Sequence, residues 1–584
     1  MAYQVSPGVN ITEKDLTTVV PNVSTNIGGF AGRFSWGPAN ERTAITSENA
    51  LVELFGKPDA NTQEWFWCAA NYLAYANNLI VVRSHNGALN GVVGDDDTGT
   101  AVTVNNSTHY DSLTYTDQLF VAKYPGVKGN SLKITAIDSN GWADSTVNAD
   151  FLAHFDSAPG TSADVANANG SASFVANDEM HVLVIDEDGL FTGVPGEVLE
   201  RWAYVSKASD AKKIDGSSNY VVDVLKNESK YAYVGLVTQF TTNTTGSEKA
   251  AGNPKAGGAF LTFNSATASE SVPGGSLAGG TDGSALAGSH IIAAGVGYGL
   301  FTDKATSDVT LVIGGPGISG TDTTVSAYCV NSVAAYRKDC IAFVSPAKDS
   351  VVHSGTNQVT DITGNKTAMS ANTSYGAMDS AWKYQYDRYQ DKFIWVPMCG
   401  DVAGLCAKVD YTHDAWWSPA GLTRGTIKNI VKTSWEPSKT NRDTLYKAGI
   451  NPFITQPGAG VILWGDKTMQ AAPTAFDRIN VRRLFIVLEK AIENAAKAML
   501  FEFNDEFTRS QFINMVEPFL REVQGRRGIT DFKVVCDGSN NTGEIVDANN
   551  FVGDIYVKPS RSINFIQLNF IAARSDVSFS EIGG

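Results

Sequence analysis

Six residues with the spacing of a dinucleotide-binding loop, Gly315–Gly320 (GPGISG), follow the strand-forming run 309–313 (VTLVI). In such a loop, glycines permit a tight turn and the N–H groups of the next helix bind a pyrophosphate. A complete site also needs an acidic residue at the end of the second strand. Here Asp339 precedes the next predicted strand, 340–344, and Pro316 lacks an amide donor. The pattern therefore favours a tight turn without a ligand, and a dinucleotide-dependent enzyme that uses Gly315–Gly320 is the less favoured alternative.

Other chemical motifs are weaker. The stretch 465–468 (GDKT) resembles a phosphate-binding loop, but Asp466 puts a carboxylate where the phosphate would lie. The sequence contains no G-x-S-x-G and no H-E-x-x-H motif, and its seven histidines are too far apart for the usual zinc spacing. Its six cysteines include no C-x-x-C pair, which predicts buried free thiols. We therefore expect no catalytic residues, no cofactor and no metal, and we predict that the chain is not an enzyme.

Charge is distributed unevenly along the 584 residues, whose net charge is −16. Residues 95–270 carry 23 acidic and 11 basic side chains, a balance of −12, whereas 421–584 carry 18 acidic and 20 basic side chains. The acidic stretch argues against nucleic-acid binding there. No apolar run reaches the roughly 18–20 residues of a membrane span, and the N-terminus has no apolar signal segment. We expect neither nucleic acid as a partner nor insertion into a membrane.

The elements that would position these motifs alternate between strands and helices in two parts of the chain. A strand at 26–33, a helix at 63–76 and a strand at 79–83 form a first α/β unit. Strands at 309–313 and 340–344, joined by a helix, form a βαβ unit. Between them, the polar residues 95–270 contain scattered strands, such as 180–185 and 231–237, and predict β-rich inserted material.

The last 120 or so residues show the clearest periodicity. Residues 479–500 form an amphipathic helix whose polar face includes Arg482, Lys490 and Lys497. A second amphipathic helix at 508–524 contains Pro518, where we expect a kink or a break. Strands follow, at 532–536, 551–557 and 563–570.

Long, ordered motifs in the C-terminal half and near the N-terminus closely resemble the tail sheath proteins of contractile-tailed phages, with the T-even type as the best match. In the C-terminal half they are Tyr384–Asp410, Trp417–Gly425, Ala448–Gly458, Val461–Thr468, Phe476–Leu488, Val534–Asp537, Asn540–Thr542 and Pro559–Leu568. Near the N-terminus they are Ser6–Glu13, 28–39 and Leu79–Arg83. The resemblance covers about residues 1–90 and 273–584, and the 95–270 insertion departs from the T-even pattern.

The resemblance implies an α+β multidomain fold with an inner α/β core, C-terminal helices with a mixed sheet, β-rich outer domains and extended terminal arms. The boundaries that we expect are an N-terminal arm at 1–22, a first core segment at 23–94, an acidic outer insertion at 95–272, a second core segment at 273–420, a C-terminal inner domain facing the tube at 421–571 and a C-terminal arm at 572–584.

The resemblance also implies a structural function. The chain would polymerise as stacked six-fold rings around a tail tube, then contract from a metastable extended state and drive the tube through the host envelope to deliver the genome. Its partners would be other copies of itself, the tube protein, and the baseplate and tail terminator proteins. It would be assembled in the host cytoplasm and end in the virion. A sheath from a related contractile injection system or a bacteriocin particle is the nearer alternative.

Two groups of residues are candidates for contacts between subunits. Arms that cannot bury themselves would add strands to a neighbouring sheet. The arm residues are Val9, Asn10, Ile11, Thr12, Glu13, Ile563, Phe565, Gln567, Asn569 and Phe570. Arg482, Lys490 and Lys497 would face the tube or an adjacent ring, although a solvated helix face explains them equally well.

Overall fold

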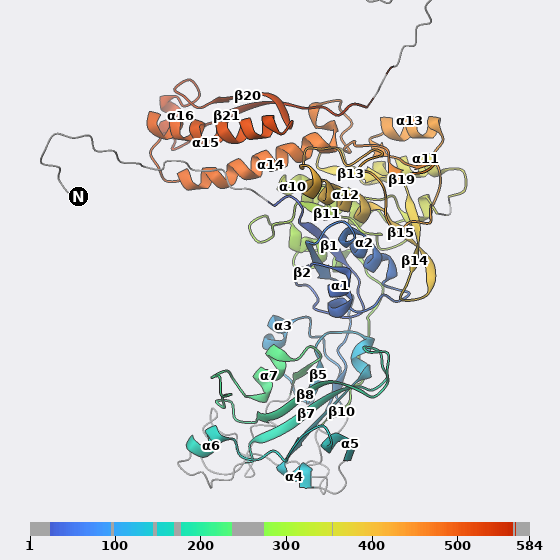
Figure 1. Ribbon diagram of the computed structural model, residues 1–584, viewed down its shortest axis with the longest axis vertical. Coiled ribbons are helices and arrows are strands. Elements are labelled where there is room, and N and C mark those ends of the chain that lie inside the picture. Colours follow the sequence, from blue (N-terminus) through green and yellow to red (C-terminus); the bar gives the residue numbers. More distant parts are fainter. Residues whose placement is uncertain are drawn as a thin grey trace, which may run out of the picture. The chain divides into compact units, whose positions relative to one another are not determined.

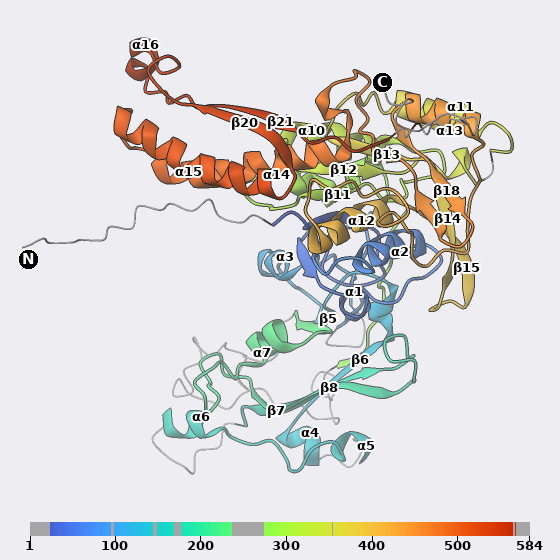
Figure 2. The same ribbon diagram turned by 45° about the horizontal axis from the view of Figure 1, so that its top comes forward.

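A computed structural model of the chain describes residues 24–94, 99–143, 149–168, 177–235, 274–352, 354–564 and 567. The chain divides into two compact units. The larger contains Ser24–Thr412 and Pro419–Pro473, and the smaller contains His413–Ser418 and the chain from Thr474 onward. Figures 1 and 2 show helices and several separate sheets along the chain. The predicted α+β multidomain fold class is confirmed. The arm at 1–22, with Val9–Glu13, and the tail at 572–584 lie outside the described residues.

A seven-stranded sheet forms the core of the larger unit, in the order β17-β13-β12-β11-β1-β3-β2. Its neighbouring strands pair in parallel except for β2, which is antiparallel to β3. The strands are β1 (Gly28–Gly32), β2 (Thr43–Ile45), β3 (Leu79–Arg83), β11 (Leu311–Ile313), β12 (Ile341–Val344), β13 (Gly376–Asp379) and β17 (Ile450–Asn451). The central strands are buried on both faces, as expected for a parallel sheet. The predicted strands at 26–33, 79–83, 309–313 and 340–344 are all present.

Helices cover both faces of this sheet. On one face lie α2 (Gln63–Leu73) and α12 (Cys399–Thr412), which contact each other and the central strands. A continuous helical segment of α9 (Thr324–Tyr328), a π-helix (Cys329–Ala334) and α10 (Ala335–Arg337) packs on the other. The remaining helices of this core are α1 (Glu48–Phe55), α11 (Gln358–Ala368) and α13 (Lys439–Lys447).

Glycine permits the close approach of α12 to α2. A Cβ atom at Gly400 would overlap the carbonyl oxygen of Cys68, and one at Gly404 would lie 2.6 Å from the ring of Tyr75. The added Cβ atom would lie 2.3 Å from its neighbour at Gly400 and 2.6 Å from its neighbour at Gly404. Real Cβ atoms do not approach other atoms so closely, so only glycine fits at these positions. The two helix backbones therefore meet directly, which fixes how α12 lies on the sheet.

The inserted part of the larger unit is built mainly from two antiparallel sheets. One has the order β10-β6-β7-β8 and the other β4-β5-β9. Their strands are β4 (Val92–Val93), β5 (Phe120–Ala122), β6 (Leu132–Asp138), β7 (Glu179–Asp186), β8 (Glu197–Ser206), β9 (Ala232–Val234) and β10 (Gly274–Ser276). Short helices accompany them: α3 (Ser107–Ser112), α4 (Ser139–Ala143), α5 (Ala149–Leu152), α6 (Ala163–Ala168) and α7 (Val221–Glu228). The strands predicted at 180–185 and 231–237 correspond to β7 and β9.

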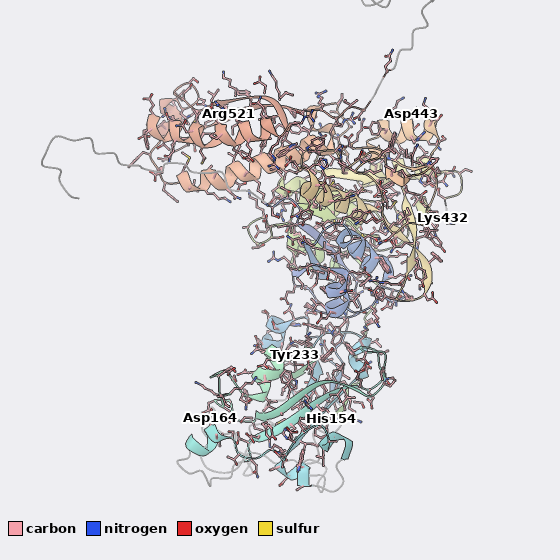
Figure 3. The ribbon with its side chains drawn as sticks, viewed as in Figure 1. His154, Asp164, Tyr233, Lys432, Asp443 and Arg521 are labelled. Carbon is pink, nitrogen blue, oxygen red and sulfur yellow. The ribbon has the colours of Figure 1, made fainter. Side chains whose placement is uncertain are left out.

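The insertion has its own core and is joined to the α/β part by specific contacts. Tyr233 of β9, which is labelled in Figure 3, stacks on Tyr110 with ring centroids 4.4 Å apart. Arg83, at the end of β3, is buried and donates hydrogen bonds to the carbonyl oxygens of Phe34, Gly37 and Pro125. Because Pro125 belongs to the insertion, this one guanidinium connects it to the α/β sheet.

The division between the units differs from the predicted boundary at residue 421. Residues 419–473 belong to the larger unit, because β17 pairs with β13 of the main sheet and β16 (Lys432–Thr433) pairs with β14. The small sheets here are β14 (Trp382–Asp387) with β15 (Lys392–Pro397) and β16, and β18 (Phe453–Gln456) with β19 (Gly460–Leu463). The C-terminal unit therefore begins at 474 instead of 421.

Two long helices and a β-hairpin form the smaller unit. The elements are α14 (Ile479–Ala496), a 3-10 turn (Lys497–Met499), α15 (Glu506–Gly525), β20 (Ile529–Val535), α16 (Gly543–Asp547) and β21 (Asp554–Pro559). Leu484 and Leu488 of α14 pack with Met515 and Leu520 of α15 in one apolar cluster, and the β20–β21 ribbon runs alongside α15 (Figures 1 and 2). Of the two alternatives expected at Pro518, a kink or a break, the break is wrong because α15 continues through it, and the kink stays a prediction.

The contact at Gly400 generates a first prediction. Gly400→Ala should lower the apparent Tm of the purified subunit, because the new methyl group overlaps the backbone of α2; overpacking of this kind costs about 1–3 kcal/mol. Differential scanning fluorimetry measures the shift. Gly364→Ala in α11 is the matched control, since its Cβ would meet open space, and it should raise stability by roughly 0.5–1 kcal/mol. Equal shifts in the two variants would contradict the proposed overlap.

Candidate assembly surface and the glycine turn

The glycine turn lies where a doubly wound sheet would bind a nucleotide. The strand β1 has β3 on one side and β11 on the other, so the chain reverses its direction of winding there, and ligands bind such sheets at the carboxyl ends of these strands. The indole of Trp65, on α2, fills this position. A Cβ atom at Gly32 would lie 2.7 Å from it and one at Gly315 2.9 Å from it. The crevice is therefore packed with an aromatic side chain.

A carboxylate of the chain itself accepts hydrogen bonds from one amide of the turn and from the start of the next helix. Gly315 and Gly317 have φ values of 68° and 83°, as a tight turn requires. Asp322 accepts hydrogen bonds from the backbone N–H of Ile318 at 3.0 Å and of Thr324 at 2.9 Å. The carboxylate of Asp349 lies directly against Gly320. Negative charge thus already occupies the region where a pyrophosphate would bind.

The second loop, 465–468, is also internally satisfied. The side chain of Asn451 accepts a hydrogen bond from the N–H of Lys467 at 2.7 Å and donates one to the carbonyl of Lys467 at 2.8 Å. Asp466 is buried and accepts a hydrogen bond from Tyr446 at 3.3 Å. The loop is a packed turn beside β17.

Other arrangements for chemistry are not found among the described residues. No group of three or more His, Cys, Asp or Glu side chains in them could hold a metal ion. A helix suited to crossing a membrane is also not found in that part of the chain. All six cysteines are buried free thiols.

The smaller unit presents a sheet with two open edges. Within the described residues, β20 and β21 pair only with each other, in antiparallel register from Asp531↔Lys558 to Val535↔Asp554. A two-stranded ribbon has unpaired N–H and C=O groups along both outer sides, which makes it a template for further strands. The helix pair α14–α15 supports the ribbon through Phe532, Val534, Ile555 and Val557, which pack on the shared apolar cluster.

Exposed large apolar side chains, here called the aromatic cluster, follow α14 and reach into the first turn of α15. It consists of Leu500, Phe501, Phe503 and Phe507, all with more than half of their surface exposed. Phe501 is fully exposed and has a positive φ of 73°. Soluble monomers rarely expose so many large apolar side chains together. Periodicity could not reveal this cluster, although the run LFEF just after the helical pattern was a signal for it.

Comparison with known proteins places the whole chain in one family. The family described as "Phage tail sheath protein central domain" matches residues 293–469, "Phage tail sheath C-terminal domain" matches 471–573 and "Tail sheath protein Gp18 domain III N-terminal region" matches 27–83. The tail sheath protein of Vibrio phage KVP40 is 33% identical, with 99% of each chain covered. The chain belongs to the phage tail sheath protein family. The tail sheath protein of Enterobacteria phage T4 is 31% identical, again over 99% of both chains.

Solved structures of sheath proteins share the fold. The sheath tail protein of Desulfitobacterium hafniense covers 91% of this chain and 94% of its own, with a TM-score of 0.51 and 14% identity. The sheath tail protein Lin1278 of Listeria innocua covers 93% of this chain and 97% of its own, with a TM-score of 0.51 and 12% identity. The family is structural, and its members are parts of the phage tail. The expectation from the sequence motifs is thereby confirmed at the level of family and fold.

The three basic residues predicted on the polar face of α14 of this sheath protein differ in their burial. The placement of Arg482 on the exposed polar face is wrong, because only 4% of Arg482 is exposed. Its guanidinium lies 4.8 Å from the ring centroid of Phe476 and bonds to Glu489 at 3.1 Å. Lys497 is exposed and lies 3.7 Å from Glu493, whereas Lys490 is half-buried. Arg482 therefore packs between α14 and the turn that precedes it, and the two lysines remain candidates for contact.

The predicted C-terminal arm is only partly described. Ile563 and Gln567 are exposed and lie in no strand. Phe565, Asn569 and Phe570 fall outside the described residues of the sheath chain. The role of these residues stays a prediction.

The packed glycine turn generates a second prediction. Neither NAD nor ATP should produce binding heat in isothermal titration calorimetry with the full-length subunit, because Trp65 and the two carboxylates occupy the ligand position. A mononucleotide should behave in the same way. Saturable heat with either ligand, lost in Gly315→Val, would contradict this and would restore the alternative of a dinucleotide-dependent enzyme.

Proposed function

We propose that this chain is the subunit of a contractile phage tail sheath and that it polymerises as stacked six-fold rings around a tail tube. The observation that carries the proposal is the similarity to phage tail sheath proteins over 99% of both chains. The extended packing is metastable and is held by a kinetic barrier. Contraction then converts it into a packing of lower free energy. The released free energy drives the tube through the host envelope.

Strand exchange between subunits is the proposed connection. The ribbon of β20 and β21 offers two open edges within the described residues. The arm 1–22, around Val9–Glu13, and the segment Ile563–Phe570 of neighbouring subunits would supply the strands, since strand addition satisfies backbone groups on both partners. Such a heterologous contact does not close on itself and generates a helical tube.

The smaller unit is the part that we place against the tail tube. Lys490 and Lys497 on α14 would contact an acidic surface of the tube protein, and the aromatic cluster at 500–507 would be covered by an adjacent subunit. The acidic insertion, with its balance of −12 over residues 95–270, fits an outward, solvated position. Baseplate and terminator proteins would bind the two ends of the polymer.

No enzymatic activity is part of this function. Contraction needs no nucleotide, because its free energy is stored in the packing of the extended state. The filled crevice at Trp65 supports this view. Assembly takes place in the host cytoplasm, before the particle is released.

A third prediction concerns the N-terminal arm. Deletion of Met1–Asn22 should leave a folded subunit that no longer forms tubes, because on this proposal the arm supplies a strand to a neighbouring subunit. Negative-stain electron microscopy measures assembly, and circular dichroism checks the fold. Tubes of normal length from the deletion variant would contradict the proposal that the N-terminal arm connects neighbouring subunits.

A fourth prediction concerns α14. The double variant Lys490→Glu/Lys497→Glu should weaken co-sedimentation with assembled tail tubes by roughly tenfold at low salt, since each charge contact at the surface contributes on the order of 1 kcal/mol. The difference should shrink at high salt, where such contacts are screened.

Arg521→Glu on α15 is the matched control. Arg521 projects from α15 (Figure 3) and forms an i,i+4 pair with Glu517 at 3.2 Å, like the pair between Lys497 and Glu493. Its reversal therefore breaks a comparable intrahelical pair without touching α14. Equal loss of tube binding in the control and in the double variant would argue against a specific role of α14.

A further inference from the structure

Two buried cysteines on different helices are in direct contact. The Sγ atoms of Cys68, on α2, and Cys399, the first residue of α12, are 3.6 Å apart, and both side chains have no exposed surface. The two residues are 331 positions apart in the sequence. Only the packing of α12 on α2 brings them together. The Sγ atom of Cys399 also lies 3.9 Å from the carbonyl oxygen of Gly315 in the glycine turn, and neither cysteine belongs to the proposed assembly surface.

The helix backbones are close enough for a covalent bond between these sulfurs. A Cβ atom at Gly400 would overlap the carbonyl oxygen of Cys68 and would lie 3.3 Å from its Sγ. For a disulfide, the distance of 3.6 Å between the two Sγ atoms must shorten to about 2.05 Å. Bond formation therefore requires rotation of two side chains and a small shift, with no separation of the helices.

The two thiols differ in their readiness to react. Burial acts to raise the pKa of the Cys399 thiol, but hydrogen bonds with Cys68 and Ser345 and with nearby backbone groups lower it below its ordinary value. The pKa of the Cys68 thiol is raised, first by burial and then by its hydrogen bond with Cys399. Since the thiolate is the nucleophile, the proposal assigns the first attack to Cys399.

We propose that Cys68 and Cys399 form an oxidation site, at which hydrogen peroxide converts the contacting thiols into a disulfide between α2 and α12. The Cys399 thiolate attacks one peroxide oxygen, the O–O bond breaks, and the hydroxide that leaves takes up the thiol proton as water. The sulfur of Cys68 then attacks the sulfenic sulfur of Cys399. The S–O bond breaks, and hydroxide leaves with the Cys68 proton as a second water. Two thiols are oxidised and one peroxide is reduced.

The bond would close a domain that is discontinuous in sequence. Cys68 belongs to the segment that supplies β1 and β3, and Cys399 to the segment that supplies β11, β12 and β13. The whole insertion at 95–272 lies between them. A disulfide here makes the two halves of the main sheet one covalent unit even if the intervening chain is cut. Particles outside a cell meet oxidising conditions, in which such a bond persists.

Peptide mapping of the native, full-length protein tests this proposal. The protein is treated with hydrogen peroxide, remaining thiols are blocked with N-ethylmaleimide, and trypsin digestion is followed by mass spectrometry without reductant. We expect a linked pair of peptides, 43–83 with 393–408, that has lost two hydrogen atoms and separates on reduction. A wild-type protein that shows no such link, or that links only after unfolding in denaturant, overturns the proposal.

Variants distinguish this pair from other cysteines in the same peptides. Peptide 393–408 also contains Cys406, so Cys406→Ser is the matched control and should keep the link, whereas Cys399→Ser should lose it. In Cys68→Ser, the sulfenic acid of Cys399 should accumulate and react with dimedone. A link that persists in Cys399→Ser, or a bond between Cys399 and Cys406, would contradict the assignment.

Discussion

The pairing of β1 with β11 is the interaction on which the larger unit depends. Gly28, Gly29 and Phe30 pair in parallel with Leu311, Val312 and Ile313, across an insertion that has its own sheets and core. Parallel strands cannot be joined by a tight turn, so no local signal brings these two segments together. The closure entropy is offset only by burial of both strands and by the helices on each face. Every other strand of the main sheet extends from this pair in one direction or the other.

An element of this fold was predictable from the sequence where its signal is local, and it was not predictable where it depends on contacts between distant residues. The strand at 79–83 and the helix at 479–500 were predicted well, because an apolar run or a helical period of apolar residues is local. The membership of Ile450–Asn451 in the main sheet was not predictable, since two residues have no pattern and only the register with β13 defines the strand. The placement of Arg482 failed for a similar reason, because Phe476 covers it from the preceding turn.

The continuity of α15 through Pro518 has a simple physical cause. Pro518 and Asn514, whose carbonyl loses its intrahelical partner, are both exposed, so water can replace the missing hydrogen bond. The prediction was based on the lost hydrogen bond and did not consider that Pro518 lies on the solvated side of the amphipathic helix. The glycine turn gives the opposite lesson. Its conformation was readable from GPGISG, but the side chain that fills the crevice, Trp65, comes from a helix about 250 residues earlier in the chain.

The division of the chain into units has a mechanical consequence. The polypeptide enters the smaller unit at 413–418, returns to the larger one for 419–473 and leaves it again at 474. Among the described residues, the chain therefore crosses between the units at 412–413, 418–419 and 473–474, instead of through one linker. A pulling force on the smaller unit is shared among these crossings, so that no single peptide segment bears the full load. For a protein that belongs to a family of tail sheaths, such load sharing lets one unit transmit force while the chain between the units resists being drawn out.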